Sequence, residues 1–200
     1  MAPFGLCPAC LLSAALSMDD EPCPYRIVAP MDEDARGVTY LAEARTGVRG
    51  HVVLKLLGPR DDADAIVSRY RQWKPAIERV RHPSVAPLLD VGLTADGATY
   101  VATAYVGGWP LSALASKPPL GPGAHQAIAR QLSAAMEAAH EAGVVHLTLD
   151  STKVKISTTN GPHATILGLG SALILDGADW DSDADRLALT RLRLALGLGQ

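Results

Sequence analysis

The first half of the chain alternates apolar and polar residues, which is the pattern of half-buried β-strands. Three such segments occupy residues 25–29, 37–44 and 51–57, and two more occupy residues 85–93 and 98–106. A glycine-rich stretch separates the second segment from the third, and an Ala-Asp-Gly turn lies between the last two. The pattern therefore predicts about five strands in this half.

Between the third and fourth strand segments, the apolar period changes to that of a helix. Asp61 and Asp62 are suitable caps for its start. Pro75 lies within the helical run and is expected to kink or interrupt it, because proline lacks the N–H that a helix interior uses. The predicted apolar stripe consists of Ile66, Tyr70, Trp73, Ile77 and Val80.

The second half of the chain begins with a longer helical pattern. A helix is predicted over residues 121–143, and Gly143 suits its C-cap. Segments 153–157 and 163–167 flank a Thr-Thr-Asn-Gly turn, which predicts a β-hairpin. The apolar face of the predicted helix consists of Ile128, Leu132, Met136 and Ala139.

A final helix is predicted over residues 182–197, which are rich in leucine. Ser182 or Asp183 is the expected cap of this helix. Strands in the first half and helices with one hairpin in the second half together predict an α+β fold.

Composition argues against a nucleic-acid-binding, membrane-spanning or secreted protein. The chain has 200 residues, of which 48% are hydrophobic and 20% charged, and its net charge is −3. Such a balance predicts no strong attraction to nucleic acid or to an anionic membrane. No apolar run reaches the roughly 18 residues that a spanning helix needs, and no basic residue precedes the short apolar stretch near the N-terminus. We therefore expect a cytoplasmic protein without a secretory signal.

All three cysteines, Cys7, Cys10 and Cys23, lie near the N-terminus. An odd number of cysteines without a framework favours a reducing compartment over a disulfide scaffold. Cys7 and Cys10 form half of a zinc site, but a structural zinc needs four ligands. Two interpretations stay open: a zinc site completed by Cys23 and a second chain, or a flexible leader with free thiols.

Five motifs follow one another along the chain: VVLK at 52–55, RHPSVAPLLDVG at 81–92, YVATAYVGG at 100–108, GVVHLTLDSTKVKI at 143–156 and ILGLGSA at 166–172. In this order they resemble the motifs of bacterial Ser/Thr protein kinases. The resemblance implies a two-lobed protein kinase-like fold, with a leader at 1–24, a β-rich N-lobe with one helix at 25–106 and a shortened helical C-lobe at 107–200.

The resemblance implies where a nucleotide would lie. Lys55 matches the lysine that pairs with phosphates, and Gly37 matches the third glycine of the phosphate loop. Asp32 and Asp34 match its first two glycines, where carboxylates would repel a triphosphate. The remaining nucleotide-pocket positions are Val53, Thr103, Tyr105 and Val106, and Val53 is bulkier than the alanine that the family has there.

The positions that carry chemistry in the family hold unsuitable residues. Thr148 matches the catalytic base but has no basicity near neutral pH. Lys153 matches a Mg²⁺-binding asparagine, and Gly168 matches the Mg²⁺-binding aspartate of the DFG motif, so no magnesium is expected. Asp150 stands where the family has a lysine, and Trp73 stands where a glutamate would hold Lys55. Asp176, just downstream, is a rival candidate for the missing carboxylate.

The resemblance therefore implies a catalytically inactive kinase-like module, a pseudokinase, that binds ATP weakly or not at all. We expect it to act by regulating or scaffolding a protein partner, such as an active kinase or its substrate. The alternative is a Ser/Thr kinase-like enzyme with residual or unconventional ATP-dependent activity.

Two structural expectations accompany this interpretation. A shortened C-lobe should expose apolar residues of the last helix, which resembles the central C-lobe helix with Asp183 at its start, and so favour a protein partner or a homo-oligomer. The apolar residues in question are Leu187, Leu189, Leu192, Leu194 and Leu196.

The second expectation concerns charge. The acidic residues Asp32, Asp34 and Asp150 should pair with the lysines Lys55, Lys153 and Lys155 and so seal the nucleotide cleft.

Overall fold

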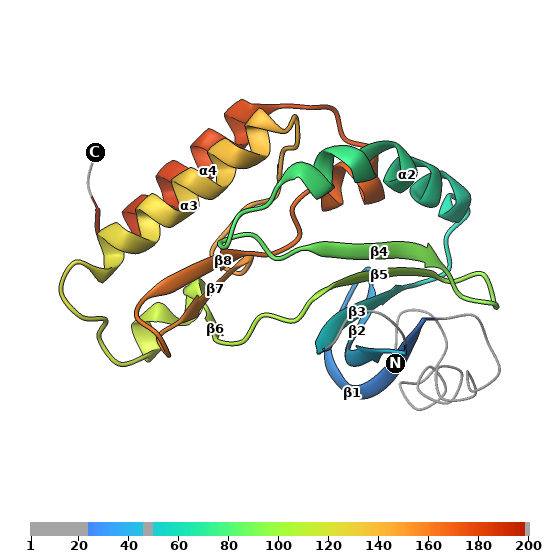
Figure 1. Ribbon diagram of the computed structural model, residues 1–200, viewed down its shortest axis with the longest axis horizontal. Helices are drawn as coiled ribbons and strands as arrows, with labels where there is room; N and C mark the ends of the chain where they lie inside the picture. The colour runs from blue at the N-terminus through green and yellow to red at the C-terminus, as the bar shows by residue number, and fades with distance from the viewer. Residues whose placement is uncertain (1–23, 46–49, 199–200) are drawn as a thin grey trace. The chain divides into compact units, whose positions relative to one another are not determined.

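A computed structural model describes residues 24–45 and 50–198 of the chain, shown in Figure 1. The chain divides into two compact units. Of the described residues, the first unit contains 24–45, 50–68 and 88–105, and the second contains 69–87 and 106–198. The three cysteines lie outside the described residues, and so does the zinc interpretation that rests on them.

The described part of the first unit is an antiparallel sheet of five strands in the order β1-β2-β3-β5-β4. The five predicted strands are thereby confirmed. A cluster of buried residues from four of the strands, including Tyr25, Val52, Leu54 and Tyr100, forms the core of the sheet. The strands are β1 (Tyr25–Asp34), β2 (Gly37–Ala44), β3 (His51–Leu57), β4 (Leu88–Leu93) and β5 (Thr99–Ala104).

Strand β1 is an edge strand whose pairing with β2 is irregular. The register shifts between Ile27 and Ala29 and again between Pro30 and Asp32, so Val28 and Met31 are bulge residues. Both bulge side chains are nearly half exposed. Bulges and a proline protect an edge strand from pairing with another chain. The strand ends at Asp34, in the turn to β2.

Helix α2 (Ala63–Arg79) runs without a break through Pro75, so the interruption, one of the two predicted outcomes, is wrong, and the kink stays a prediction. The proline is tolerated because Pro75 and Arg71, whose carbonyl would have been its partner, both lie on the exposed face. Water can therefore satisfy that carbonyl. Ile77 is buried as predicted, whereas Val80 lies one residue beyond the helix.

The second unit combines helices with a small sheet of described strands in the order β6-β7-β8. Its two long helices, α3 and α4, lie side by side in Figure 1 and contact each other. The predicted hairpin is confirmed as the antiparallel pair β7 and β8. The elements are β6 (Trp109–Pro110), η2 (Leu111–Ser116), α3 (Ala124–Glu141), β7 (Val154–Ser157), β8 (His163–Ile166), η3 (Ala172–Asp176) and α4 (Ser182–Ala195).

The ends of the two long helices test the predicted caps. Gly143 follows α3 with φ +79°, and its N–H donates to the carbonyl of His140, which confirms it as the terminating glycine. The cap of α4 is Asp181, whose carboxylate accepts from the N–H of Asp183 at 2.9 Å. The prediction of Ser182 or Asp183 is therefore wrong by one residue or two.

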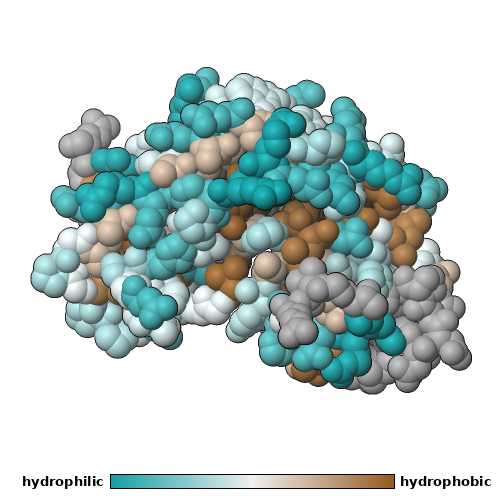
Figure 2. Space-filling view, viewed as in Figure 1, coloured by the Kyte–Doolittle hydropathy of each residue, from teal (hydrophilic) through white to brown (hydrophobic). Residues whose placement is uncertain are grey.

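The leucines of α4 are only partly exposed. Leu187 and Leu194 are 52% and 57% exposed, as expected, but Leu192 and Leu196 are buried. Figure 2 shows that hydrophilic and weakly hydrophobic residues mix over the surface of α3 in this view. No helix in the described part of the chain is long and apolar enough to cross a membrane.

Candidate functional site

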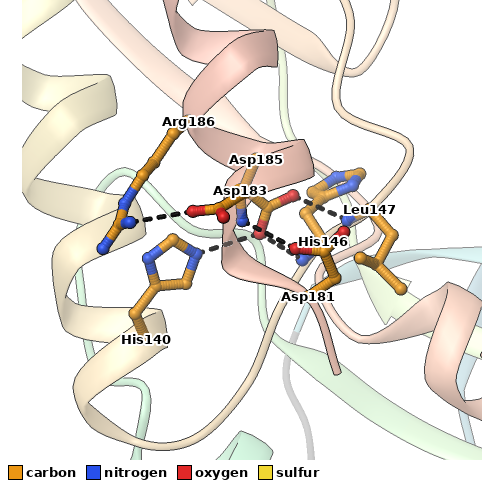
Figure 3. A network of polar contacts seen from close by, with 7 residues as sticks. All are labelled: His140, His146, Leu147, Asp181, Asp183, Asp185 and Arg186. Atoms are coloured by element: carbon orange, nitrogen blue, oxygen red, sulfur yellow. Dashed lines mark hydrogen bonds and ion pairs between the residues drawn. The ribbon is translucent and has the colours of Figure 1, made fainter. Parts of the chain in front are cut away.

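The loop between α3 and β7 is held by one buried carboxylate, drawn in Figure 3. Asp185, on the first turn of α4, has no exposed surface. It accepts hydrogen bonds from the backbone N–H groups of His146 and Leu147, at 2.8 and 2.7 Å. The Nε2 atom of His140 lies 3.0 Å from the same carboxylate. Three groups from α3 and the loop thus converge on one side chain.

These bonds fix an unusual backbone conformation. Leu147 has φ +65°, which a residue with a side chain adopts only at a cost of about 1–2 kcal/mol. Hydrogen bonds from buried N–H groups to a carboxylate are worth more than that. Asp185 therefore stabilises the loop in a shape that it would not adopt alone.

Asp183, which the resemblance places at the start of this helix, lies at the surface. Its carboxylate pairs with Arg186 at 2.9 Å, and both side chains are more than 70% exposed. The buried role belongs to Asp185, two residues later. The sequence did contain a signal for Asp185, since it begins the stripe that continues through Leu189, Leu192 and Leu196. A carboxylate on an apolar stripe must find buried partners.

His146 contributes to packing. It is 1% exposed, and its Nε2 lies 2.8 Å from the carbonyl oxygen of Leu167. Burial lowers the pKa of His146, although the bond to Leu167 and the charge of Asp185 oppose this effect. The ring is therefore neutral at neutral pH, with Nε2–H donating to Leu167. Its Nδ1 has no hydrogen-bond partner among the described residues.

The three loop positions that matched catalytic residues lie at the surface. Thr148, Asp150 and Lys153 are all exposed. The carboxylate of Asp150 accepts from the N–H and hydroxyl of Thr152, at 2.7 and 2.5 Å, and from the N–H of Lys153 at 3.2 Å. Partial burial raises the pKa of Asp150, but these hydrogen bonds outweigh it and lower the pKa. The charge of Lys153 also lowers the pKa of Asp150, but among the described residues Asp150 forms no ion pair with a lysine, and its carboxylate closes a turn.

The segment that matched the DFG motif follows β8. Gly168 and Gly170 both have φ +77°, and Leu169 between them is buried. The carbonyl oxygen of Lys153 accepts from the N–H of Leu167 at 2.8 Å, which ties the loop to this segment. A Cβ at position 170 would lie 2.9 Å from the side chain of Ile77, so glycine fits best there.

The π-helical turn η3 comes directly after this segment and ends at Asp176. Arg69 fixes the turn, because its Nε donates to the carbonyl of Ile174 at 2.6 Å. Within residues 24–45 and 50–198, no group of three or more His, Cys, Asp or Glu side chains could hold a metal ion. Asp176 therefore has no set of described ligands around it with which to form a metal site.

Lys55 lies on β3 in the first unit and pairs with Asp34. The distance from Nζ to Oδ2 is 2.5 Å, and the two side chains are 24% and 50% exposed. The N–H of Arg36 donates to the same aspartate at 2.9 Å. Of the expected charge pairs, this one is present, whereas no ion pair in the described residues joins Asp32 or Asp150 to a lysine.

The remaining nucleotide-pocket positions are divided between the two units. Val53 on β3 pairs in register with Thr103 on β5, and Tyr105 donates its N–H to the carbonyl of His51 at 3.2 Å. The side chain of Tyr105 is 46% exposed. Val106 and Trp73 belong to the second unit, with Trp73 partly buried on α2. Lys155, also in the second unit, is partly buried on β7.

Comparisons with known proteins agree with this fold. No protein-family model matches the chain. It is 32% identical over 177 residues to serine/threonine-protein kinase pkn3 of Myxococcus xanthus, a match that covers 86% of this chain and 31% of that protein. It is 30% identical over 152 residues to serine/threonine-protein kinase PknE of Mycobacterium tuberculosis, covering 74% of this chain and 26% of that protein. The chain thus spans about a third or less of the length of these relatives.

Solved structures lead to the same class of protein. The crystal structure of the M. tuberculosis PknI kinase domain superposes with a TM-score of 0.68 and 26% sequence identity. The match covers 87% of this chain and 72% of that chain. The fold is therefore that of a protein kinase domain. The chain is a protein kinase-like domain, and its homologues are bacterial Ser/Thr protein kinases.

Proposed function

We propose that this chain is a non-catalytic protein kinase-like module that acts by binding a protein partner and not by transferring phosphate. The observation that carries the proposal is a contrast within one loop. Its backbone is held by Asp185, yet the position of the base is Thr148, whose hydroxyl cannot accept a proton usefully at neutral pH.

A second observation concerns the metal. Phosphoryl transfer in this family needs Mg²⁺ held by carboxylate and amide oxygens. The matching positions are Lys153, a cation, and Gly168, which has no side chain. Because catalytic groups act as a unit, losing several of them removes the activity as a whole. Neither Mg²⁺ nor ATP is therefore expected as a cofactor.

A partner surface is available on α4. Leu187 and Leu194 are more than half exposed and lie two helical turns apart, on one side of the helix. Exposed apolar residues of this kind suit a protein partner or a second copy of the chain. The partner we favour is an active kinase or its substrate.

The competing proposal is an enzyme with residual or unconventional ATP-dependent activity. It is favoured by Lys55, which the chain retains on β3, and by relatives that are named as kinases. Activity that depends on Lys55 would separate the two proposals.

The test is an assay of phosphate transfer from labelled ATP, with Mg²⁺ and then with Mn²⁺, to the protein itself and to a general acceptor protein. We expect no transfer by the wild-type chain, while an active bacterial Ser/Thr kinase serves as the positive control. Thr148→Asp should stay inactive, because one restored group does not rebuild a cooperative site.

The control for contaminating kinases is Lys55→Met. Label transferred equally by the wild type and this variant would come from a contaminant and would leave the proposal standing. Stoichiometric transfer by the wild type that Lys55→Met abolishes would show that the chain is an enzyme and that the non-catalytic proposal is wrong.

A further inference from the structure

The ion pair between Lys55 and Asp34 lies entirely within the first unit. Lys55 is on β3, and Asp34 is the last residue of β1. Within the described residues, no other carboxylate forms an ion pair with Lys55. The lysine that the resemblance assigns to a nucleotide phosphate thus already has an anionic partner from its own chain.

The strand register explains how Asp34 reaches Lys55 across the intervening strand β2. Asp34 pairs with Gly37, and Gly37 pairs with Leu57. Since residues two apart share a face of a strand, Lys55 lies on the same face as Leu57. Gly37 places no side chain on that face between them. The carboxylate can therefore reach the ammonium group over the gap that the glycine leaves.

Only glycine suits position 37. Its φ is +147°, and a Cβ there would lie 2.0 Å from the carbonyl oxygen of Leu56. A larger residue would need the backbone of β3 to shift. The gap beside Asp34 is thus built into the sheet and does not depend on a movable side chain.

Asp34 is an anion at neutral pH. Its partial burial raises the pKa, but the bond from Lys55 and the N–H of Arg36 outweigh this effect and lower the pKa. A carboxylate in contact with an ammonium neutralises the charge that would attract a phosphate, and it repels the phosphate as well.

We propose that Asp34 is a specificity-determining residue that occupies Lys55 in the place of a phosphate and so excludes polyphosphate anions from this lysine. The inference deepens the proposed non-catalytic function, on which it rests, by identifying what prevents nucleotide binding. Removing the charge of Asp34 should leave Lys55 available to a triphosphate, without restoring any catalytic group.

The experiment is isothermal titration calorimetry at low ionic strength, with ATP and separately with inorganic tripolyphosphate, both in the presence of EDTA. We compare the wild type with Asp34→Asn, which keeps the size of the side chain and removes its charge. The variant should bind both ligands at least about tenfold more tightly than the wild type, because a repulsive charge in contact with the phosphate is gone. The second ligand separates affinity for phosphate from affinity for the base.

Glu33→Gln is the matched control, since Glu33 is an exposed acidic residue on the same strand and, as the neighbour of Asp34, points to the opposite face of the sheet. It makes the same change in net charge and should bind like the wild type. The double variant Asp34→Asn/Lys55→Met should lose the gain in affinity for ATP and tripolyphosphate. Circular dichroism of each variant confirms that it is folded before titration.

Three results would overturn the inference: no gain in affinity in Asp34→Asn, an equal gain in Glu33→Gln, or a gain that survives the loss of Lys55. Each of these results leaves the non-catalytic proposal intact. That proposal is tested by whether the chain transfers phosphate and not by how tightly it binds polyphosphate. Conversely, phosphate transfer by the wild type would contradict the functional proposal, while the comparison between the Asp34 and Glu33 variants would still measure how strongly Asp34 excludes polyphosphate from Lys55.

Discussion

Two aspartates in this chain, Asp185 in the second unit and Asp34 in the first, bind similar groups in opposite surroundings. Asp185 has no exposed surface and accepts from two backbone N–H groups, with a histidine at 3.0 Å. The side chain of Asp34 is half exposed and accepts from Lys55 and from the backbone N–H groups of Arg36 and Gly37. The hydrogen-bond distances of the two carboxylates are similar, so the main difference between them is how far each is exposed to solvent.

The difference in burial gives the two aspartates different expected roles, a structural one for Asp185 and a ligand-selecting one for Asp34. Solvent cannot replace the bonds of a buried carboxylate, and leaving its partners unsatisfied costs about 1–3 kcal/mol for each group. An exposed ion pair is worth only about 0.2–1 kcal/mol, because water solvates both ions when they separate. Asp185 should therefore determine whether the loop keeps its shape, whereas Asp34 should determine which ligands can reach Lys55.

The same contrast runs through the loop itself. His146 and Leu149 are buried, and the backbone around them is fixed by Asp185. Thr148, Asp150 and Lys153 alternate with them at the surface. The buried half of the loop suits the kinase-like fold, whereas the exposed half has side chains that we propose do not support phosphate transfer. Folding constrains which residues can occupy the buried positions, whereas only function would constrain those at the exposed positions.

Replacing Asp185 should have the largest effect. Asp185→Ala leaves the N–H groups of His146 and Leu147 without their acceptor, and we expect the free energy of unfolding of the second unit to fall by about 3–5 kcal/mol. All three tryptophans, Trp73, Trp109 and Trp180, belong to the second unit. Urea unfolding followed by selectively excited tryptophan fluorescence therefore reports on this unit alone.

Asp183→Ala is the control on the same turn of α4, since its carboxylate is 82% exposed. Its effect should stay within about 0.5 kcal/mol, as for most surface substitutions. Equal losses in the two variants would mean that helix capping, and not the buried network, determines the stability of this unit.

The buried histidine should make the second unit sensitive to acid. Because folding lowers the pKa of His146, the unfolded chain takes up a proton below about pH 6.5 that the folded state refuses. Stability should therefore fall as the pH falls through this range, by at most about 1.4 kcal/mol for each pH unit. The measurement is tryptophan-detected urea unfolding at a series of pH values between neutral and mildly acidic.

His146→Gln tests the assignment, since its amide can donate to the carbonyl of Leu167 but cannot titrate. The variant should show a flatter dependence of stability on pH than the wild type. An unchanged slope would show that other groups cause the acid sensitivity and that His146 is not its source.

The sequence predicted those features of the fold that depend on regular periodicity. The five strands, the hairpin and the long helices follow from apolar patterns of two and 3.6 residues, and Gly143 follows from the conformational freedom of glycine. Pro75 misled the prediction, because its effect depends on which face of α2 meets solvent. The predicted apolar stripe already leaves Pro75 on the solvent side, so the sequence contained a signal that the helix could continue.

The site was less predictable, because its contacts join residues far apart in the chain. Lys55 and Asp34 were both candidates, but only the strand register and the gap at Gly37 show that they meet. Asp185 was overlooked in favour of Asp183, since both lie near the start of one helix. The apolar stripe through Leu192 would have distinguished them, because only Asp185 lies on it.

The smallest expected effect is on the stability of the first unit when Asp34 becomes Asn. We expect a loss below about 1 kcal/mol, because the pair with Lys55 is partly exposed and water replaces it. Hydrogen exchange of the β2 and β3 amides, read by mass spectrometry, measures this in a unit that contains no tryptophan. The difference in stability between Asp34→Asn and the wild type should become smaller in high salt, because salt screens exposed charges. A salt-independent loss as large as that of Asp185→Ala would instead make Asp34 a structural residue, and any gain in polyphosphate binding would then reflect a loosened sheet.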